Sequence, residues 1–96
     1  MNVVISDKAY SDLTFLFQYS IETFGLPKTE AYLKSIYEKI SYLAVMPGIG
    51  HTHKSLPDYL RVINVAKHLV IYTAKEPDVV IVLRIVHHKM NLSDIT

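Results

Sequence analysis

The apolar residues of this chain change their spacing about halfway along it. In the first half they recur every three or four residues along two stretches: Ala9, Leu13, Leu16, Phe17, Ile21 and Phe24, and then Leu33, Ile36, Tyr37, Ile40, Leu43 and Ala44. This spacing places them on one face of a helix, so it predicts two amphipathic helices. From residue 60 onward the apolar residues come in short runs rich in Val and Ile, which is typical of strands. Helices followed by strands in this way predict an α+β fold.

Local signals mark the ends of the two helices. Ser6 is a suitable N-cap, and Asp7 places a negative charge in the first turn of the first helix. Gly25 follows the last apolar residue of that helix, as a C′ glycine should, and Pro27 can occupy the first turn of the second helix. We expect the second helix to end at Pro47-Gly48. Because the connection is short, the helices are predicted to form an antiparallel hairpin.

Four strands are predicted around the helical hairpin. Residues 2–5 form a short N-terminal strand, and residues 60–65, 68–73 and 79–86 form a three-stranded antiparallel meander. The first turn of the meander is tight and lies at Ala66-Lys67. The last strand begins with five consecutive apolar residues, so it should be central and covered on both faces. The predicted order is strand, helix, helix, strand, strand, strand, with the hairpin packed on one face of a small, mostly antiparallel sheet.

Length, composition and charge narrow the possible functions. The 96 residues form a single domain spanning 1–96. The chain has no cysteine, which excludes disulfides, thiolate zinc sites and cysteine nucleophiles and suits a reducing cytoplasm. A net charge of +1 gives little non-specific attraction to nucleic acid, and the longest apolar run is too short to span a membrane. The mean hydropathy of +0.21 is high for a small domain, so we expect a protein partner to cover part of the surface.

Metal and cofactor sites are not expected from the residue pattern. His51 and His53 fall on one side of an extended segment, but the only acidic residue near them is Asp58. Without cysteines, this pair falls short of the ligand sets that hold zinc in proteins.

Three aromatic side chains lie opposite the apolar faces of the predicted helices. Projected at about 100° per residue, Phe15 and Tyr19 fall opposite the apolar face of the first helix, and Tyr42 falls opposite that of the second. Isolated exposed aromatics are ordinary in soluble proteins. The alternative is a docking surface, because Tyr and Phe are enriched in interfaces and a partner helix lying across the hairpin would bury them.

Several short segments occur in an order and spacing that a known family shares: Asp12-Leu13, Phe24-Gly25, Tyr32-Leu33, Leu60-Arg61, Lys67-His68, Val70-Ile71-Tyr72, Arg84-Ile85 and His87. They cover nearly the whole chain and resemble the ParE/RelE superfamily of toxins from type II toxin–antitoxin modules. The resemblance implies the fold predicted above and a small cytoplasmic bacterial toxin. It also implies a hetero-oligomer with a cognate antitoxin, whose C-terminal segment wraps around the toxin.

The superfamily has two kinds of target. RelE-like members are endoribonucleases that cut mRNA on the ribosome, whereas ParE-like members inhibit DNA gyrase and are not known to be enzymes. Cutting RNA through its own 2′-OH needs a base, a cation that stabilises the phosphorane, and an acid. The two alternatives therefore make different demands on the side chains.

The nuclease alternative has candidate residues. Arg61 and Arg84 would bind phosphate, His87 or His88 would be the general acid or base, and Lys54 is a further cation. Alternation along the last strand predicts that one face carries Arg84, Val86 and His88, and the other Leu83, Ile85 and His87. Arg84 and His88 on the first of these faces would form an anion-binding trio with Arg61 from the first strand of the meander.

Other features favour the ParE-like alternative. The loop at residues 48–59 has no glutamate and no tyrosine follows Tyr72, whereas the nuclease branch uses a loop glutamate and a C-terminal tyrosine. The segment from Arg84 to Leu92 resembles the ending of ParE-like members. One departure is Ala66, because family members often have glycine before the basic residue of that turn. A positive φ would be strained for alanine there.

We therefore interpret the chain as a ParE-like toxin, a non-enzymatic inhibitor that stalls gyrase on cleaved DNA. Its antitoxin would cover the helical hairpin at Phe15, Tyr19 and Tyr42. In this interpretation Arg84 anchors the sheet through a hydrogen-bonded network and His87 is a structural histidine. A RelE-like mRNA endoribonuclease remains the alternative, and a toxin fold that has lost its activity is a third possibility.

Overall fold

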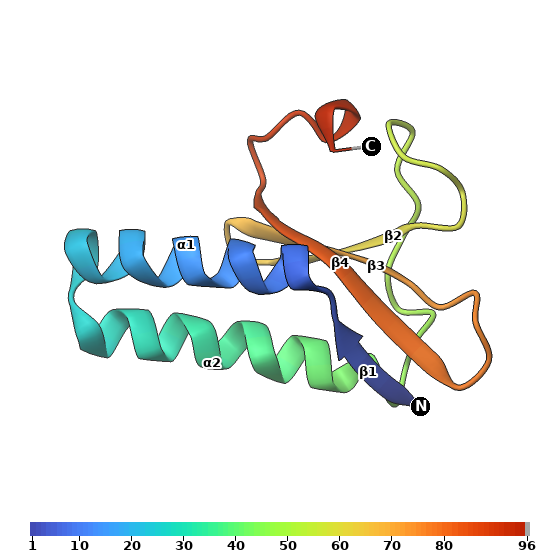
Figure 1. The fold of residues 1–96 in the computed structure, drawn as a ribbon, viewed down its shortest axis with the longest axis horizontal. Helices are drawn as coiled ribbons and strands as arrows, with labels where there is room; N and C mark the ends of the chain where they lie inside the picture. Colours follow the sequence, from blue (N-terminus) through green and yellow to red (C-terminus); the bar gives the residue numbers. More distant parts are fainter. Residues whose placement is uncertain (96) are drawn as a thin grey trace.

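The computed structural model describes residues 1–95 and confirms the predicted α+β order. A helical hairpin lies along one side of a twisted sheet, as Figure 1 shows. In chain order, the elements are β1 (Asn2–Ile5), α1 (Asp7–Phe24), α2 (Leu26–Tyr42), β2 (Arg61–Val65), β3 (His68–Thr73), β4 (Val79–His87) and the short 3-10 helix η1 (Leu92–Asp94).

The sheet has the strand order β1-β4-β3-β2. The pairs β2–β3 and β3–β4 are antiparallel and form the predicted meander, while β1 runs parallel to β4. This confirms that β4 is an inner strand, with Val80 and Val82 fully buried. The pairing of β1 with β4 ends at Ile5 and Val82, so the second half of β4 extends beyond its strand neighbour on that side.

The predicted signals at the helix ends are present in the structure. The Ser6 hydroxyl oxygen accepts a hydrogen bond from the Ala9 N–H at 3.1 Å and caps α1. Gly25, with φ of 85°, separates the two helices in a conformation that suits glycine, and proline lies in the first turn of α2. The second helix ends at Tyr42 and is followed by turns, so it ends earlier than the predicted Pro47-Gly48.

The sheet is buried on both faces. The helices cover one face and form the first core, which includes Ile36, Leu43, Val70, Tyr72 and Val82. The loop before β2 and the C-terminal segment cover the opposite face and form a second core, made of Leu56, Leu60, Val62, Ile71, Val86 and Leu92. Figure 1 shows these two segments close together, away from the helices. Both faces of the sheet therefore need apolar residues, which explains the continuous apolar run in β4.

The turn between β2 and β3 contains a strained alanine. Val65 pairs with His68, which leaves Ala66 and Lys67 as a two-residue turn. Among residues 1–95, Ala66 (φ 51°) and Asp78 (φ 62°) are the only non-glycine residues with positive φ. A positive φ at the first turn residue alone matches a type II′ turn, which prefers glycine at that position.

Replacing Ala66 with Gly is expected to raise the free energy of unfolding by about 0.5–1 kcal/mol. Relief of the left-handed strain outweighs the added entropy of glycine in the unfolded chain. Urea denaturation of both proteins measures the change. Ala31→Gly, the same substitution on the exposed side of α2, is the matched control and should lower stability by about 1 kcal/mol. A loss of stability in both variants would contradict the strain at Ala66.

Candidate functional site

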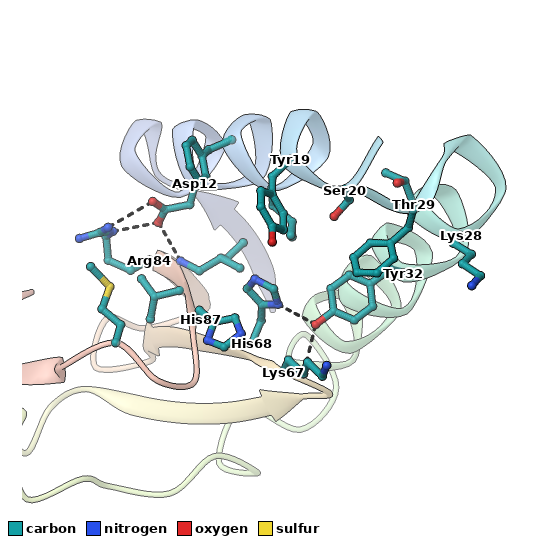
Figure 2. Close-up of a pocket in the computed structure, with 16 residues that line it drawn as sticks. Asp12, Tyr19, Ser20, Lys28, Thr29, Tyr32, Lys67, His68, Arg84 and His87 are labelled. Carbon is teal, nitrogen blue, oxygen red and sulfur yellow. Dashed lines mark hydrogen bonds and ion pairs between the residues drawn. The ribbon is translucent and has the colours of Figure 1, made fainter. Parts of the chain in front are cut away.

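A groove of about 700 Å³ lies between the two helices, the β2–β3 turn and the end of β4 (Figure 2). We call it the α1–β4 groove. Most of its lining is apolar, and its apolar side chains include Phe15, Leu16, Tyr19, Phe24, Ile85 and Met90. Four of them are much exposed for large hydrophobic residues: Phe15 at 72%, Tyr19 and Phe24 at 57%, and Met90 at 43%. Such a hollow apolar surface is typical of a docking site for another protein.

The structure brings together two of the three aromatic residues predicted to contact an antitoxin. Phe15 and Tyr19 both line the α1–β4 groove. Tyr42 lies elsewhere, in a shallow hollow near the C-terminal end of α2 that it shares with Tyr37 and Val45. The helical projection established that each residue faces away from the core. It did not show that the outward faces of the two helices point to different surfaces.

An ion pair forms one wall of the groove. The Arg84 guanidinium donates to both carboxylate oxygens of Asp12, from Nε at 2.8 Å and from Nη2 at 3.2 Å. The same carboxylate accepts a hydrogen bond from the Ile85 N–H at 2.9 Å. This N–H lies where β4 no longer has β1 beside it, so Asp12 supplies the acceptor that a neighbouring strand would provide. The Asp12 carboxylate thus connects α1 to both Arg84 and the backbone of β4.

A β-bulge changes which way the residues at the end of β4 face. Ile71 pairs with Arg84 but the next residue, Tyr72, pairs with Val82, so Leu83 is the extra residue of the bulge. As a result, Leu83 packs with Val86 in the second core, while Ile85 belongs to the first core. The predicted grouping of Leu83 with Ile85 on one face is therefore wrong.

The predicted anion-binding trio is not assembled in this structure. Arg84 is paired with Asp12, and the Arg61 Nη1 donates to the Gly50 carbonyl oxygen at 2.8 Å. The prediction that His87 and His88 face opposite ways is also wrong, because the strand ends at His87 and the two rings stack with centroids 4.5 Å apart. Lys54 is exposed in the loop before β2 and does not line the groove.

Three histidines cluster at the end of the groove. His68 pairs with His87 across the sheet, and their rings meet edge to face with centroids 5.4 Å apart. His88 stacks on the other side of His87. The Tyr32 hydroxyl lies 2.6 Å from His68 Nδ1 and accepts a hydrogen bond from the Lys67 N–H at 3.2 Å. Figure 2 shows Tyr19, Tyr32, His68 and His87 facing the same space.

His68 and Tyr32 were not predicted from the sequence as members of this cluster. The tight turn at Ala66-Lys67 was a signal for His68, because it places that residue at the start of the middle strand of the meander. The residue that pairs with His68 across the sheet, His87, depends on the bulge in β4, and no local sequence pattern predicts that bulge. Tyr32 lies on α2, so only helix packing brings it to the turn.

The environment shifts the proton affinities of this cluster. Burial lowers the pKa of His68, and the nearby His87 and His88 lower it further because a second positive charge would be repelled. The pKa of His87 is also lowered, by partial desolvation and by the charges of His88, Lys89 and Lys67. Burial raises the pKa of Tyr32, against a smaller opposing effect of the Lys67 N–H. Near neutral pH, Tyr32 and His68 are therefore both uncharged.

Within residues 1–95, no three histidine, aspartate or glutamate side chains lie close enough together to hold a metal ion. His53 Nδ1 instead accepts a hydrogen bond from the Ser55 N–H at 3.0 Å. None of the helices described here is both long and apolar enough to cross a bilayer.

Comparison with known proteins places the chain in a family. The family model described as the ParE toxin of the type II toxin–antitoxin system parDE matches residues 3–92. The fold is similar to that of a solved structure, "Chromosomal ParDE TA system from P. aeruginosa", with a TM-score of 0.78 and 20% sequence identity. That similarity covers 91% of this chain and 95% of the other. The curated proteins provide no match. Because the family model spans almost the whole domain, this chain belongs to the ParE toxin family of type II toxin–antitoxin systems.

Proposed function

We propose that this chain is a toxin that inhibits DNA gyrase, and that a cognate antitoxin neutralises it by laying a segment in the α1–β4 groove. Membership of the ParE toxin family supports the toxin role. The observation that carries the antitoxin site is the apolar groove, in which Phe15 and Tyr19 remain exposed although the chain has a well-packed core. A partner helix or extended segment would remove these rings from water.

The side chains support gyrase inhibition over RNA cleavage. Both arginines that a nuclease would use for phosphate, Arg61 and Arg84, have partners within the domain. Arg84 is neutralised by Asp12 and Arg61 is held against the Gly50 carbonyl oxygen, so the two guanidinium groups do not form the phosphate site that the nuclease proposal requires. The net charge of +1 also gives little general attraction to RNA.

Paired assays on toxin freed from its antitoxin test the target. One measures supercoiling by DNA gyrase together with trapped cleaved DNA, and the other maps mRNA ends by primer extension in a translating extract. We expect gyrase inhibition with intact message. Message cut within codons while gyrase stays active would replace this proposal with the RelE-like nuclease. If the protein neither inhibits gyrase nor cleaves mRNA, it has a toxin fold without activity.

The double substitution Phe15→Ser/Tyr19→Ser is expected to weaken antitoxin binding at least 100-fold. Aromatic hot spots at the centre of an interface cost about 2 kcal/mol or more each when they are truncated, so two of them exceed the roughly 2.8 kcal/mol that a 100-fold change requires. Both side chains are more than half exposed, so the variant should fold. Calorimetric titration with the antitoxin measures the affinity.

Tyr42→Ser is the matched control for this experiment, because it removes an aromatic of similar exposure outside the groove. It should weaken binding clearly less than the double variant. If Tyr42→Ser has the larger effect, the antitoxin contacts the outer side of α2, and the groove is not the principal site.

A further inference from the structure

The α1–β4 groove carries an unbalanced positive charge at one end. The charged residues in its lining are Asp12, Lys28, Lys67 and Arg84, and Asp12 and Arg84 form the only ion pair among residues 1–95. Lys28 and Lys67 therefore remain as uncompensated cations in the lining. Lys67 lies next to His68 and near His87, two further groups that can become positive, whereas Lys28 lies farther along the groove at the start of α2 (Figure 2).

The histidines add a charge that depends on proton uptake. His68, His87 and His88 form one cluster of rings in contact, edge to face between His68 and His87 and stacked between His87 and His88, with Lys67 and Lys89 as the neighbouring charged groups and Tyr32 as the neutral contact from α2. Within residues 1–95, no carboxylate forms an ion pair with these cations, because the single acid of the groove is held by Arg84. In the free protein, a proton on His68 and a proton on His87 therefore repel each other.

We propose that the antitoxin segment in the groove is acidic at this end, and that one of its carboxylates binds against His68, His87 and Lys67 with uptake of a proton. This inference rests on the proposed function, since it takes the antitoxin as the occupant. Charge complementarity supports it: an apolar helix or strand with a carboxylate at one end matches a groove that is apolar along α1 and positive beside the β2–β3 turn. A carboxylate there would offset the repulsion between protonated His68 and protonated His87 in the free toxin.

The sign of the pH dependence follows from linkage. In the free toxin, the pKa values of His68 and His87 lie below their ordinary value, so both rings are mostly neutral at pH 7. A carboxylate nearby favours the protonated ring and raises the pKa in the complex. Binding is then tighter at lower pH. The affinity increases as the pH falls from the histidine pKa of the complex to that of the free toxin. Above the pKa of the complex the affinity should level off.

Calorimetric titration of the toxin with its antitoxin at pH 8.0, 7.0 and 6.0 tests the inference. Uptake of one proton changes the dissociation constant by up to about tenfold per pH unit, so we expect binding about 5- to 20-fold tighter at pH 6.0 than at pH 8.0. Histidine ring resonances in NMR spectra should show the pKa values of His68 and His87 rising on binding. His87→Gln, at an exposed position, should remove most of the pH dependence and leave the fold intact.

His51→Gln is the matched control, because His51 is exposed in the loop before β2 and lies outside the groove. It should keep the pH dependence of the original toxin. Lys28→Gln/Lys67→Gln should weaken binding roughly 3- to 10-fold and reduce its dependence on salt.

The two proposals fail in different ways. If no antitoxin binds at any pH, the proposed function fails. If the antitoxin binds and the Phe15 and Tyr19 substitutions weaken it, but its affinity is independent of pH and of the lysine substitutions, only the acidic contact is overturned. If a short single-stranded RNA competes with the antitoxin for the lysines and histidines while antitoxin binding stays independent of pH, the positive end serves nucleic acid and the inference is also overturned.

Discussion

Replacing Asp12 with Ala is expected to lower the free energy of unfolding by about 2–3 kcal/mol. The Asp12 carboxylate accepts hydrogen bonds from two Arg84 nitrogens and from the Ile85 N–H, and the Asp12 and Arg84 side chains are only 14% and 18% exposed. Alanine leaves a guanidinium and a backbone N–H without acceptors in a partly buried place, which costs more than the loss of an ordinary surface ion pair. Urea denaturation, with circular dichroism as the signal, measures the change.

Two variants separate the contributions to this prediction. Asp12→Asn keeps one side-chain oxygen for the Ile85 N–H, so it should lose less stability than Asp12→Ala. Arg84→Gln leaves the Asp12 carboxylate with the Ile85 N–H and should also lose less. If Asp12→Ala costs under about 0.5 kcal/mol, the contact contributes no more than a typical surface ion pair and does not anchor α1 to β4.

Tyr72→Phe is expected to lower the free energy of unfolding by about 2–3 kcal/mol. Tyr72 is fully buried, and its hydroxyl donates to the Pro47 carbonyl oxygen at 2.7 Å and accepts from the Gly50 N–H at 2.9 Å. Phenylalanine fills the same space but leaves both backbone groups without this partner. Those bonds connect the inner strand β3 to the chain after α2. The loop at residues 47–60 should therefore also become more open to proteolysis.

Tyr59→Phe is the matched control for this prediction, because Tyr59 is 53% exposed and its hydroxyl makes no hydrogen bond within residues 1–95. It should change stability by less than about 0.5 kcal/mol. Gly50→Ala tests the same contact from the other side, since a Cβ on Gly50 would lie 2.6 Å from the Tyr72 hydroxyl oxygen. Equal stability of Tyr72→Phe and the original protein would show that water can replace the hydroxyl.

The α1–β4 groove connects these stability predictions to function. Asp12 and Arg84 line the groove as well as holding α1 to β4, so Asp12→Ala also disturbs the proposed antitoxin site. Tyr72→Phe acts on the loop before β2, and neither Tyr72 nor Gly50 is among the residues lining the groove. We expect antitoxin affinity to fall in the first variant and to change little in the second, once both are measured under conditions where the toxin is folded.

Much of the fold could be predicted from the sequence because its signals are local. The cap at Ser6, the glycine at Gly25 and the proline after it act within one helical turn, and they set where α1 begins and ends and where α2 begins. The apolar run in β4 predicts an inner strand whatever its neighbours are. The outward direction of Phe15 and Tyr19 also follows from the period of one helix alone.

The tertiary structure alone decided how those elements meet. Asp12 and Arg84 are 72 positions apart, and their contact depends on α1 lying beside the part of β4 that extends past β1. The bulge at Leu83 reversed the expected facing of that residue, and the packing of α2 brought Tyr32 to His68. Hydrophobic period and capping act over a few residues, whereas strand register and helix packing depend on the whole core closing at once. That is why the sequence alone could predict the helices and strands, but not the groove that they form.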